Sequence, residues 1–171
     1  YGLGQSWSGN RVTSALTKLF DANDKRALFY KDKRTEENTS WNDYNSGWAC
    51  IKYTNLNRDG SAGQDNLFAD TDFPMYRLGD VYLMYAEGVV RGATTGDAAT
   101  ALGYVNALRV RSYGNTTGNI TAGQLTLDFL LDERSRELYW EGHRRTDLIR
   151  FGKFTAGTYV WPWKGKVEAG A

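Results

Sequence analysis

The sequence predicts a mainly α-helical fold with long irregular loops and one small β-hairpin. From residue 74 to about 151, apolar residues recur at helical spacing between clear stop signals. Residues 1–73 instead are rich in Asn, Asp, Gly, Ser and Trp and show little periodicity. Two β-prone runs in this part, at 27–33 and 47–55, predict the hairpin. We therefore expect a single domain with a loop-rich part (1–73), a helical scaffold (74–154) and a tail (155–171).

The loop-rich part is predicted to contain one short helix before the hairpin. Within 11–24, these apolar residues lie near one helical face: Val12, Leu16, Leu19 and Phe20. The two strands of the hairpin are joined by the polar stretch RTEENTSWNDYNS, which carries Trp41 and Tyr44. After the hairpin, the stretch NRDGSAGQDN has the composition of a turn or a connecting loop.

Two helices of the scaffold are predicted to form an antiparallel pair. The first follows Pro74 and is expected to bury these residues: Leu78, Val81, Tyr82, Tyr85, Ala86 and Val89. The second runs from Asp97 to Ser112, ends at Gly114, and is expected to bury these residues: Ala98, Leu102, Val105 and Leu108. The pair has about the length of one tetratricopeptide-like unit. Because a lone unit cannot bury both faces, we expect an apolar helix face to be exposed in the isolated chain.

A third helix is predicted from the N-cap Thr126 to Gly142, and it carries a dense set of charges. Glu133, Glu137 and Glu141 follow one another at steps of four, which is typical of a solvated or interhelical charged face. Neighbouring carboxylates on one helix do not converge on a substrate, so we interpret them as structural and not catalytic. The only histidine, His143, follows the helix end and is also expected to be structural.

The composition limits the ligands that this chain is expected to bind. Its 171 residues suit one domain, and 21 Lys and Arg against 20 Asp and Glu leave a net charge of +1. This balance gives no electrostatic reason to expect nucleic acid or an anionic membrane surface as a partner. A single cysteine, Cys50, excludes an internal disulfide, and the single histidine argues against a zinc cluster. We expect no cofactor, although a structural calcium ion held by carboxylates is compatible with the composition.

Several long stretches, in this order, resemble the SusD/RagB family of outer-membrane nutrient-binding proteins: YRLGDVYLMYAEGVVRG, ALGYVNALRVRSYG, LTLDFLLDERSRELYWEGHRRTDLIRFGKF and WPWKG. The earlier stretches WSGNRVTSALTKLFDANDKRALFY and IKYTN are also similar to the corresponding part of the family. The resemblance implies tetratricopeptide-like helix pairs whose irregular loops carry the ligand site. It further implies a non-catalytic protein, lipid-anchored in the outer membrane at the cell surface of Bacteroidetes. Such a protein captures oligosaccharides or other polymers for a SusC-like TonB-dependent transporter.

The chain departs from a full family member in its length. It lacks the signal, the lipidation cysteine, the earlier helical repeats and the closing segment that the resemblance implies. No apolar run is long enough to cross a membrane, and residue 1 is not Met and opens no signal-like segment. We therefore expect a mature or excised piece of a longer protein, with the lipid anchor outside this chain.

A neutral glycan is held by aromatic faces that stack on sugar rings, and by amide or guanidinium donors around them. The loop-rich part supplies both kinds of group, so we predict a ligand site from these residues: Trp7, Asn10, Arg11, Trp41, Tyr44 and Trp48. For Trp7 and Trp41, a role as a buried anchor under a long loop is about equally expected. We expect the remaining tryptophans, Trp140, Trp161 and Trp163, to be buried in the scaffold.

Two other classes of function are weighed against glycan capture. A tetratricopeptide-type interaction module would bind a peptide between its helices and would expose polar side chains along residues 75–112. An enzyme acting on glycans would need two carboxylates from separate segments in one cleft, for example Asp43 and Asp59. Aromatic density in the loops favours glycan capture over the module, and no catalytic spacing is recognisable for the enzyme. A peptide or glycopeptide is the alternative nutrient.

Overall fold

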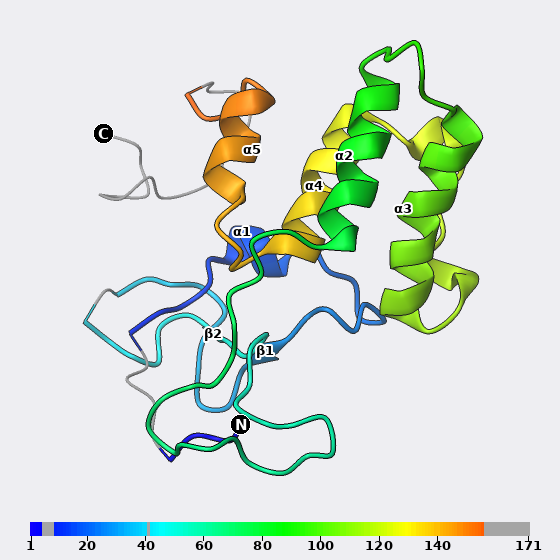
Figure 1. Cartoon of the computed structure of the whole chain (residues 1–171). Helices are drawn as coiled ribbons and strands as arrows, with labels where there is room; N and C mark the ends of the chain where they lie inside the picture. The colour runs from blue at the N-terminus through cyan, green and yellow to red at the C-terminus, as the bar shows by residue number, and fades with distance from the viewer. Residues whose placement is uncertain (5–8, 41, 156–171) are drawn as a thin grey trace. The chain divides into compact units, whose positions relative to one another are not determined.

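A computed structural model describes residues 1–4, 9–40 and 42–155 of the chain. They form two compact units, and the colours of Figure 1 allow each unit to be followed by residue number. The loop unit comprises Tyr1–Lys18 and Ala27–Phe73, and the helical unit comprises Leu19–Arg26 and the chain from Pro74 onward. The prediction of a mainly helical fold with a small antiparallel hairpin is confirmed. No helix in the described ranges is long and apolar enough to span a membrane.

The helical unit is built around the predicted helix pair. Helix α2 spans Leu78–Val90 and α3 spans Ala98–Tyr113. Asp97 caps α3 by accepting a hydrogen bond from the backbone N–H of Thr100 at 2.6 Å. Gly114 ends α3 as predicted, because its φ of +77° is a left-handed conformation that glycine adopts without strain.

Two short 3₁₀ turns, η1 (Thr116–Gly118) and η2 (Ala122–Gln124), lead from α3 to α4 (Leu127–Leu138). The predicted N-cap is confirmed, because Thr126 Oγ1 accepts a hydrogen bond from Phe129 N at 3.2 Å. The last helix, α5, spans Arg144–Arg150 and has His143 at its N-cap position.

The prediction that Trp140 is buried is wrong. It follows the end of α4 in a left-handed conformation with φ of +63°, and 41% of the residue is exposed. The extended conformation of Tyr139 ends the helix, and the left-handed Trp140 turns the chain after it. Trp161 and Trp163 lie outside the described residues.

Aliphatic side chains from α2, α3 and α4, together with Ile120 between the two 3₁₀ turns, form the core of the helical unit. The buried members are Leu83, Ala86, Ala101, Val105, Leu108, Ile120, Leu130 and Leu138. Tyr82 packs against this core, and its ring stacks in parallel on that of Tyr104 with 4.3 Å between ring centroids, which links α2 to α3.

The predicted inward face of α2 is correct for Ala86, which is buried, and for Tyr82, Tyr85 and Val89, which pack against the core, but it is wrong for Leu78 and Val81. Leu78 and Val81 are exposed, together with Met84, whereas Asp80 and Glu87 are buried. The physical reason is that both acids have arginine partners from other helices, so a pattern of apolar residues alone does not locate the buried face. Ala98 of α3 is likewise exposed, and Leu102 is only partly buried.

The two glutamates of α4 and Glu141, which follows the helix, are buried and do not face solvent. Glu133, Glu137 and Glu141 are each no more than 4% exposed. Arg26 and Arg109 contact Glu133 at 2.9 and 2.7 Å. Of the two structural interpretations, the interhelical charged face is therefore correct, because each acid has a guanidinium from a distant part of the helical unit.

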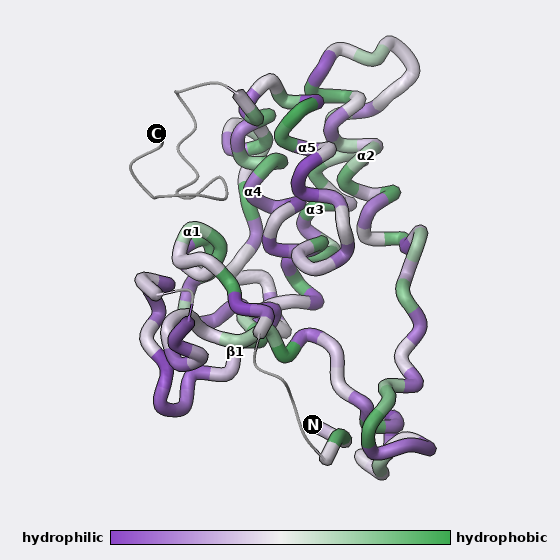
Figure 2. Tube along the Cα trace, turned by 90° about the vertical axis from the view of Figure 1, so that its left-hand side faces the viewer, coloured by the Kyte–Doolittle hydropathy of each residue, from purple (hydrophilic) through white to green (hydrophobic). Residues whose placement is uncertain are grey.

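A second set of ion pairs joins α4 to α2 and α5. Arg134 lies 2.7 Å from Asp80 of α2 and 2.9 Å from Asp147 of α5. Arg150 of α5 in turn reaches Glu87 of α2 at 2.8 Å. Figure 2 shows the resulting pattern, with hydrophilic and hydrophobic stretches interleaved along the helices. The charged motif is thus part of the scaffold.

The loop unit contains one turn of helix and a minimal sheet. The short helix predicted within 11–24 is present as α1, which spans Ser14–Thr17. The side chain of Asp21 accepts a hydrogen bond from Asn23 N at 2.8 Å, and this turn replaces a further helical turn. Residues 19–26 then belong to the helical unit. Strands β1 (Phe29–Tyr30) and β2 (Ala49–Cys50) pair antiparallel.

Candidate functional site

The predicted ligand residues that the structure describes lie around the hairpin and its connecting loop. Trp48 stands just before β2, and its backbone C=O accepts a hydrogen bond from Val12 N at 2.9 Å. Its ring is half-buried: Phe29 lies 6.2 Å away between ring centroids, and Lys31 Nζ lies 4.3 Å over the ring. Trp48 therefore contributes to the packing of the hairpin, with part of the ring exposed.

Arg11 organises the connecting loop through backbone carbonyls. Its Nη1 atom donates to the C=O of Ser40 at 3.3 Å, to that of Ser46 at 3.0 Å, and to that of Asp43. One guanidinium nitrogen thus gathers three carbonyls along seven residues of loop. Asn10, its neighbour, is exposed.

The buried side chain of Ser46 also stabilises this loop through hydrogen bonds. It is only 3% exposed, and its Oγ accepts hydrogen bonds from Thr39 N at 2.7 Å and Ser40 N at 3.0 Å. Between these anchors the loop displays Tyr44, which is 59% exposed. A loop that is fixed at its base and carries an exposed aromatic side chain can present a flat surface to a ligand at a low entropic cost.

The structure thus brings three of the predicted residues into one region: Arg11, the loop that carries Tyr44, and Trp48. Trp7 and Trp41 lie outside the described residues. The predicted site as a whole therefore stays a prediction.

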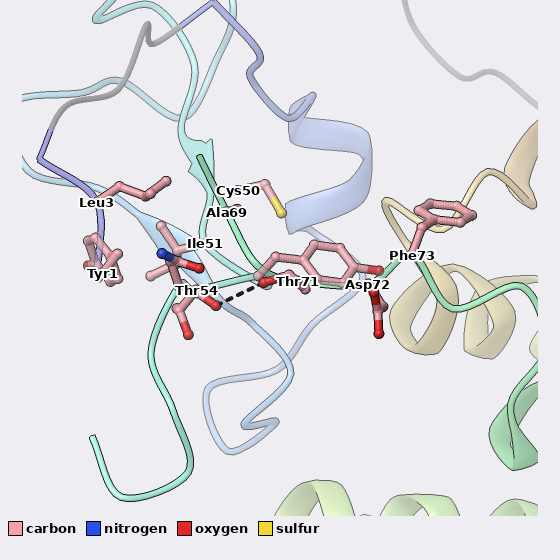
Figure 3. A pocket seen from close by; sticks show the side chains of 11 residues that line it. Tyr1, Leu3, Cys50, Ile51, Thr54, Ala69, Thr71, Asp72 and Phe73 are labelled. Atoms are coloured by element: carbon pink, nitrogen blue, oxygen red, sulfur yellow. Dashed lines mark hydrogen bonds between the residues drawn. The ribbon is translucent and has the colours of Figure 1, made fainter. Parts of the chain in front are cut away.

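A pocket of about 490 Å³, which the sequence did not indicate, lies in the loop unit. Its lining comes from three stretches of chain, as Figure 3 shows: 1–3, 50–55 and 69–73. Aromatic side chains line it together with small polar groups, and Thr71 Oγ1 donates to the C=O of Thr54 at 3.2 Å across it. The volume falls within the range of roughly 300–1,000 Å³ that is typical of small-molecule sites. The signals in the sequence that could have pointed to it are the β-prone residues Cys50, Ile51 and Tyr53 and the polar residues that follow them.

The two carboxylates weighed for an enzyme have roles in turns. Asp43 Oδ1 accepts a hydrogen bond from Asn45 N at 2.9 Å, and Asp59 Oδ1 accepts from Ser61 N at 2.9 Å. The hydrogen bonds from Ser61 lower the pKa of Asp59. Neither residue lines the pocket. These are ordinary side-chain to backbone bonds that fix loops, and they assign no catalytic role to either carboxylate.

The described parts of the chain contain no cluster of side chains that could bind a metal ion. Across residues 1–4, 9–40 and 42–155, no group of three or more His, Cys, Asp or Glu side chains is arranged to hold an ion.

Comparison with known proteins gives consistent matches. The sequence profile of the SusD family matches residues 4–169. The starch-binding protein SusD of Bacteroides thetaiotaomicron is 37% identical over 150 residues, which is 84% of this chain and 25% of that protein. A SusD-like protein of Formosa agariphila is 41% identical over 81 residues, which is 46% of this chain and 15% of that protein. The chain therefore spans about a quarter or less of these relatives.

Two solved structures share the fold. A SusD superfamily protein of Bacteroides fragilis matches with a TM-score of 0.51 and 27% identity, over 80% of this chain and 28% of that one. Surface glycan-binding protein A of Bacteroides thetaiotaomicron, solved with laminarihexaose, matches with a TM-score of 0.56 and 22% identity, over 90% of this chain and 36% of that one. The family profile covers nearly the whole length of the chain, and the fold matches that of a SusD superfamily structure. This chain therefore belongs to the SusD family.

Proposed function

We propose that the loop unit binds an oligosaccharide or polysaccharide without cleaving it. The observation that carries this proposal is the connecting loop of the hairpin, which exposes Tyr44 and is held at its base by Arg11, and which leads to the half-buried Trp48. Exposed aromatic faces with nearby polar groups are what a sugar ring requires. Two similar proteins also support glycan binding: one is a starch-binding protein, and the other was solved in complex with laminarihexaose.

The helical unit serves this function as a rigid support. Its charges are used in ion pairs between helices, so they are engaged in holding the scaffold and not in chemistry. We propose that the parent protein is not an enzyme, is held at the outer surface of the outer membrane by a lipid anchor outside this chain, and delivers its glycan to a TonB-dependent transporter. Membership of the SusD family supports this placement.

Affinity electrophoresis of the full-length parent protein through gels that contain different polysaccharides tests the proposal. The expected result is retardation by at least one glycan, which weakens in the Trp7→Ala, Trp41→Ala or Tyr44→Ala variant. By analogy with stacking on nucleobases, one aromatic platform contributes about 1–3 kcal/mol. Trp140→Ala is the matched control, because this exposed tryptophan belongs to the helical unit.

Two results would contradict the proposal. If no polysaccharide retards the parent protein, the ligand is a different nutrient, such as a peptide or glycopeptide. If Trp140→Ala abolishes retardation while the loop variants do not, the site belongs to the helical unit. In that case an interaction module of the tetratricopeptide type would describe the protein better.

A further inference from the structure

The pocket of the loop unit is held together by one buried side chain. Asn55 is only 4% exposed, and its Nδ2 donates to the backbone C=O of Gly2 at 3.3 Å and of Asp65 at 2.9 Å. Its Oδ1 accepts from Asp70 N at 2.7 Å, and its own N–H donates to the C=O of Tyr1 at 2.9 Å. One asparagine therefore links the beginning of the chain, the segment after β2 and the segment before Phe73.

Two glycines make these close approaches sterically feasible. Gly2 has a φ of +80°, and a Cβ there would lie 2.0 Å from the backbone oxygen of Asn55. A Cβ at Gly63 would lie 2.5 Å from Asp70 Oδ2 and 2.6 Å from Asn55 Nδ2. Gly2 therefore has no room for a side chain, and at Gly63 a side chain would have to displace the carboxylate of Asp70 and the amide of Asn55. A preformed site loses less conformational entropy on binding than a mobile loop does.

The chemistry of the lining is that of a neutral, amphipathic ligand. Tyr1, Tyr53 and Phe73 supply aromatic surface, and Thr71 supplies a hydroxyl. The single charged side chain in this lining is Asp72, which has no Lys or Arg beside it in the lining to offset its charge. A carboxylate accepts hydrogen bonds from sugar hydroxyls, and it repels a uronate or sulfate group held in the same small volume.

We propose that this pocket is a subsite for an uncharged sugar unit, and that it makes the protein select neutral over anionic glycans. The inference rests on the proposed glycan binding and deepens it, because it assigns the ligand class and adds a site outside the predicted tryptophans. Phe73 supplies the stacking surface and Asp72 accepts hydrogen bonds from the sugar hydroxyls.

The test uses the full-length parent protein and isothermal titration with the glycan that retards it in gels. Phe73→Ala is expected to weaken binding at least about fivefold, because one stacking surface is lost. Phe68→Ala is the matched control: Phe68 is 74% exposed against 61% for Phe73, but it does not line the pocket. Asp72→Asn is expected to weaken binding of the neutral glycan and to raise the weak binding of a uronate-containing one.

A second readout does not depend on any substitution. Cys50 lines the pocket, so the bound glycan should slow alkylation of the Cys50-containing peptide, measured by mass spectrometry, at least severalfold. Equal effects of Phe73→Ala and Phe68→Ala, together with unchanged Cys50 labelling, would overturn the inference while glycan binding itself stands. Preference of the parent protein for an anionic glycan would also overturn it. Failure of every glycan to bind would remove both the inference and the function on which it rests.

Discussion

Arg26 Nη1 lies 2.9 Å from Glu133 Oε1, although 107 residues separate the two along the chain. The contact fastens the segment that leaves the loop unit to the middle of α4. Tyr139 strengthens the same junction, because its hydroxyl donates to the backbone C=O of Arg26 at 2.7 Å. The charged motif therefore holds residues 19–26 within the helical unit, which is a structural role for residues that could be mistaken for a catalytic centre.

Replacing Glu133 with Gln should destabilise the helical unit strongly. The side chain is fully buried and faces the guanidinium groups of Arg26, Arg109 and Arg136, which would lose a shared counter-charge. Breaking a buried ion pair from one side costs about 3–5 kcal/mol. Denaturant unfolding of the parent protein measures the loss. Asp128→Asn on the same helix is the control, because its side chain is 82% exposed, and an equal effect of both substitutions would refute the structural role.

Stability should fall in acid through Glu137. Burial alone raises the pKa of this carboxyl, but hydrogen bonds from Arg111 and Arg77 outweigh burial and lower the pKa from 4.5 to about 2. A carboxyl with a lowered pKa in the folded state stabilises that state fully above its unfolded pKa. Its contribution is therefore expected to be lost as the pH falls from about 4.5 to about 2. The free energy of unfolding, measured at several pH values across this range, should depend less on pH in Glu137→Gln than in the unmodified protein. An equal dependence on pH in the two proteins would contradict the prediction.

Arg11→Ala should loosen the loop that carries Tyr44 without affecting the helices. Removing the guanidinium leaves the carbonyls of Ser40, Asp43 and Ser46 without their shared donor. Hydrogen exchange of the parent protein should become faster at residues 39–47 and stay unchanged in α2 and α4. Lys18→Ala, which removes an exposed ion pair with Glu37, serves as the control and should leave the loop as it is. Exchange that is unchanged in the Arg11 variant would mean that Ser46 alone fixes the loop.

The isolated 171-residue chain should self-associate through α2. Leu78, Val81 and Met84 are exposed at helical spacing on one face, with Met75 and Tyr76 exposed just before the helix. An apolar face of this kind promotes association in water. Sedimentation should show association that decreases when Leu78 and Met84 are both replaced by Gln. Replacing the exposed Ala107 of α3 by Gln is the control and should leave the association unchanged. A monodisperse unmodified chain would contradict this expectation.

The sequence allowed the scaffold to be predicted wherever the signals are local. The N-cap of α4 at Thr126 and the end of α3 at Gly114 each depend on one residue and its own backbone, and both were predicted correctly. The antiparallel pairing of the two β-prone runs likewise followed from residue preferences that act within a few positions.

Features that depend on distant partners were not predicted. The buried face of α2 includes Asp80 because Arg134 of α4 lies 2.7 Å from it, and no periodicity records that pairing. The exposure of Trp140 follows from a left-handed turn that nothing in its residue type favours. The pocket was not foreseen for the same reason, since Asn55 joins segments that are adjacent only after folding.

The most direct test of the central claim is hydrogen exchange of the full-length parent protein with and without the glycan that it binds. The loop unit is predicted to carry the site, so amides at 10–11, 40–48 and 50–55 should be protected. Those of α2 and α3, from Leu78 to Tyr113, should exchange at the same rate in both samples. Protection confined to α2 and α3 would contradict the account and place the ligand on the helical unit instead.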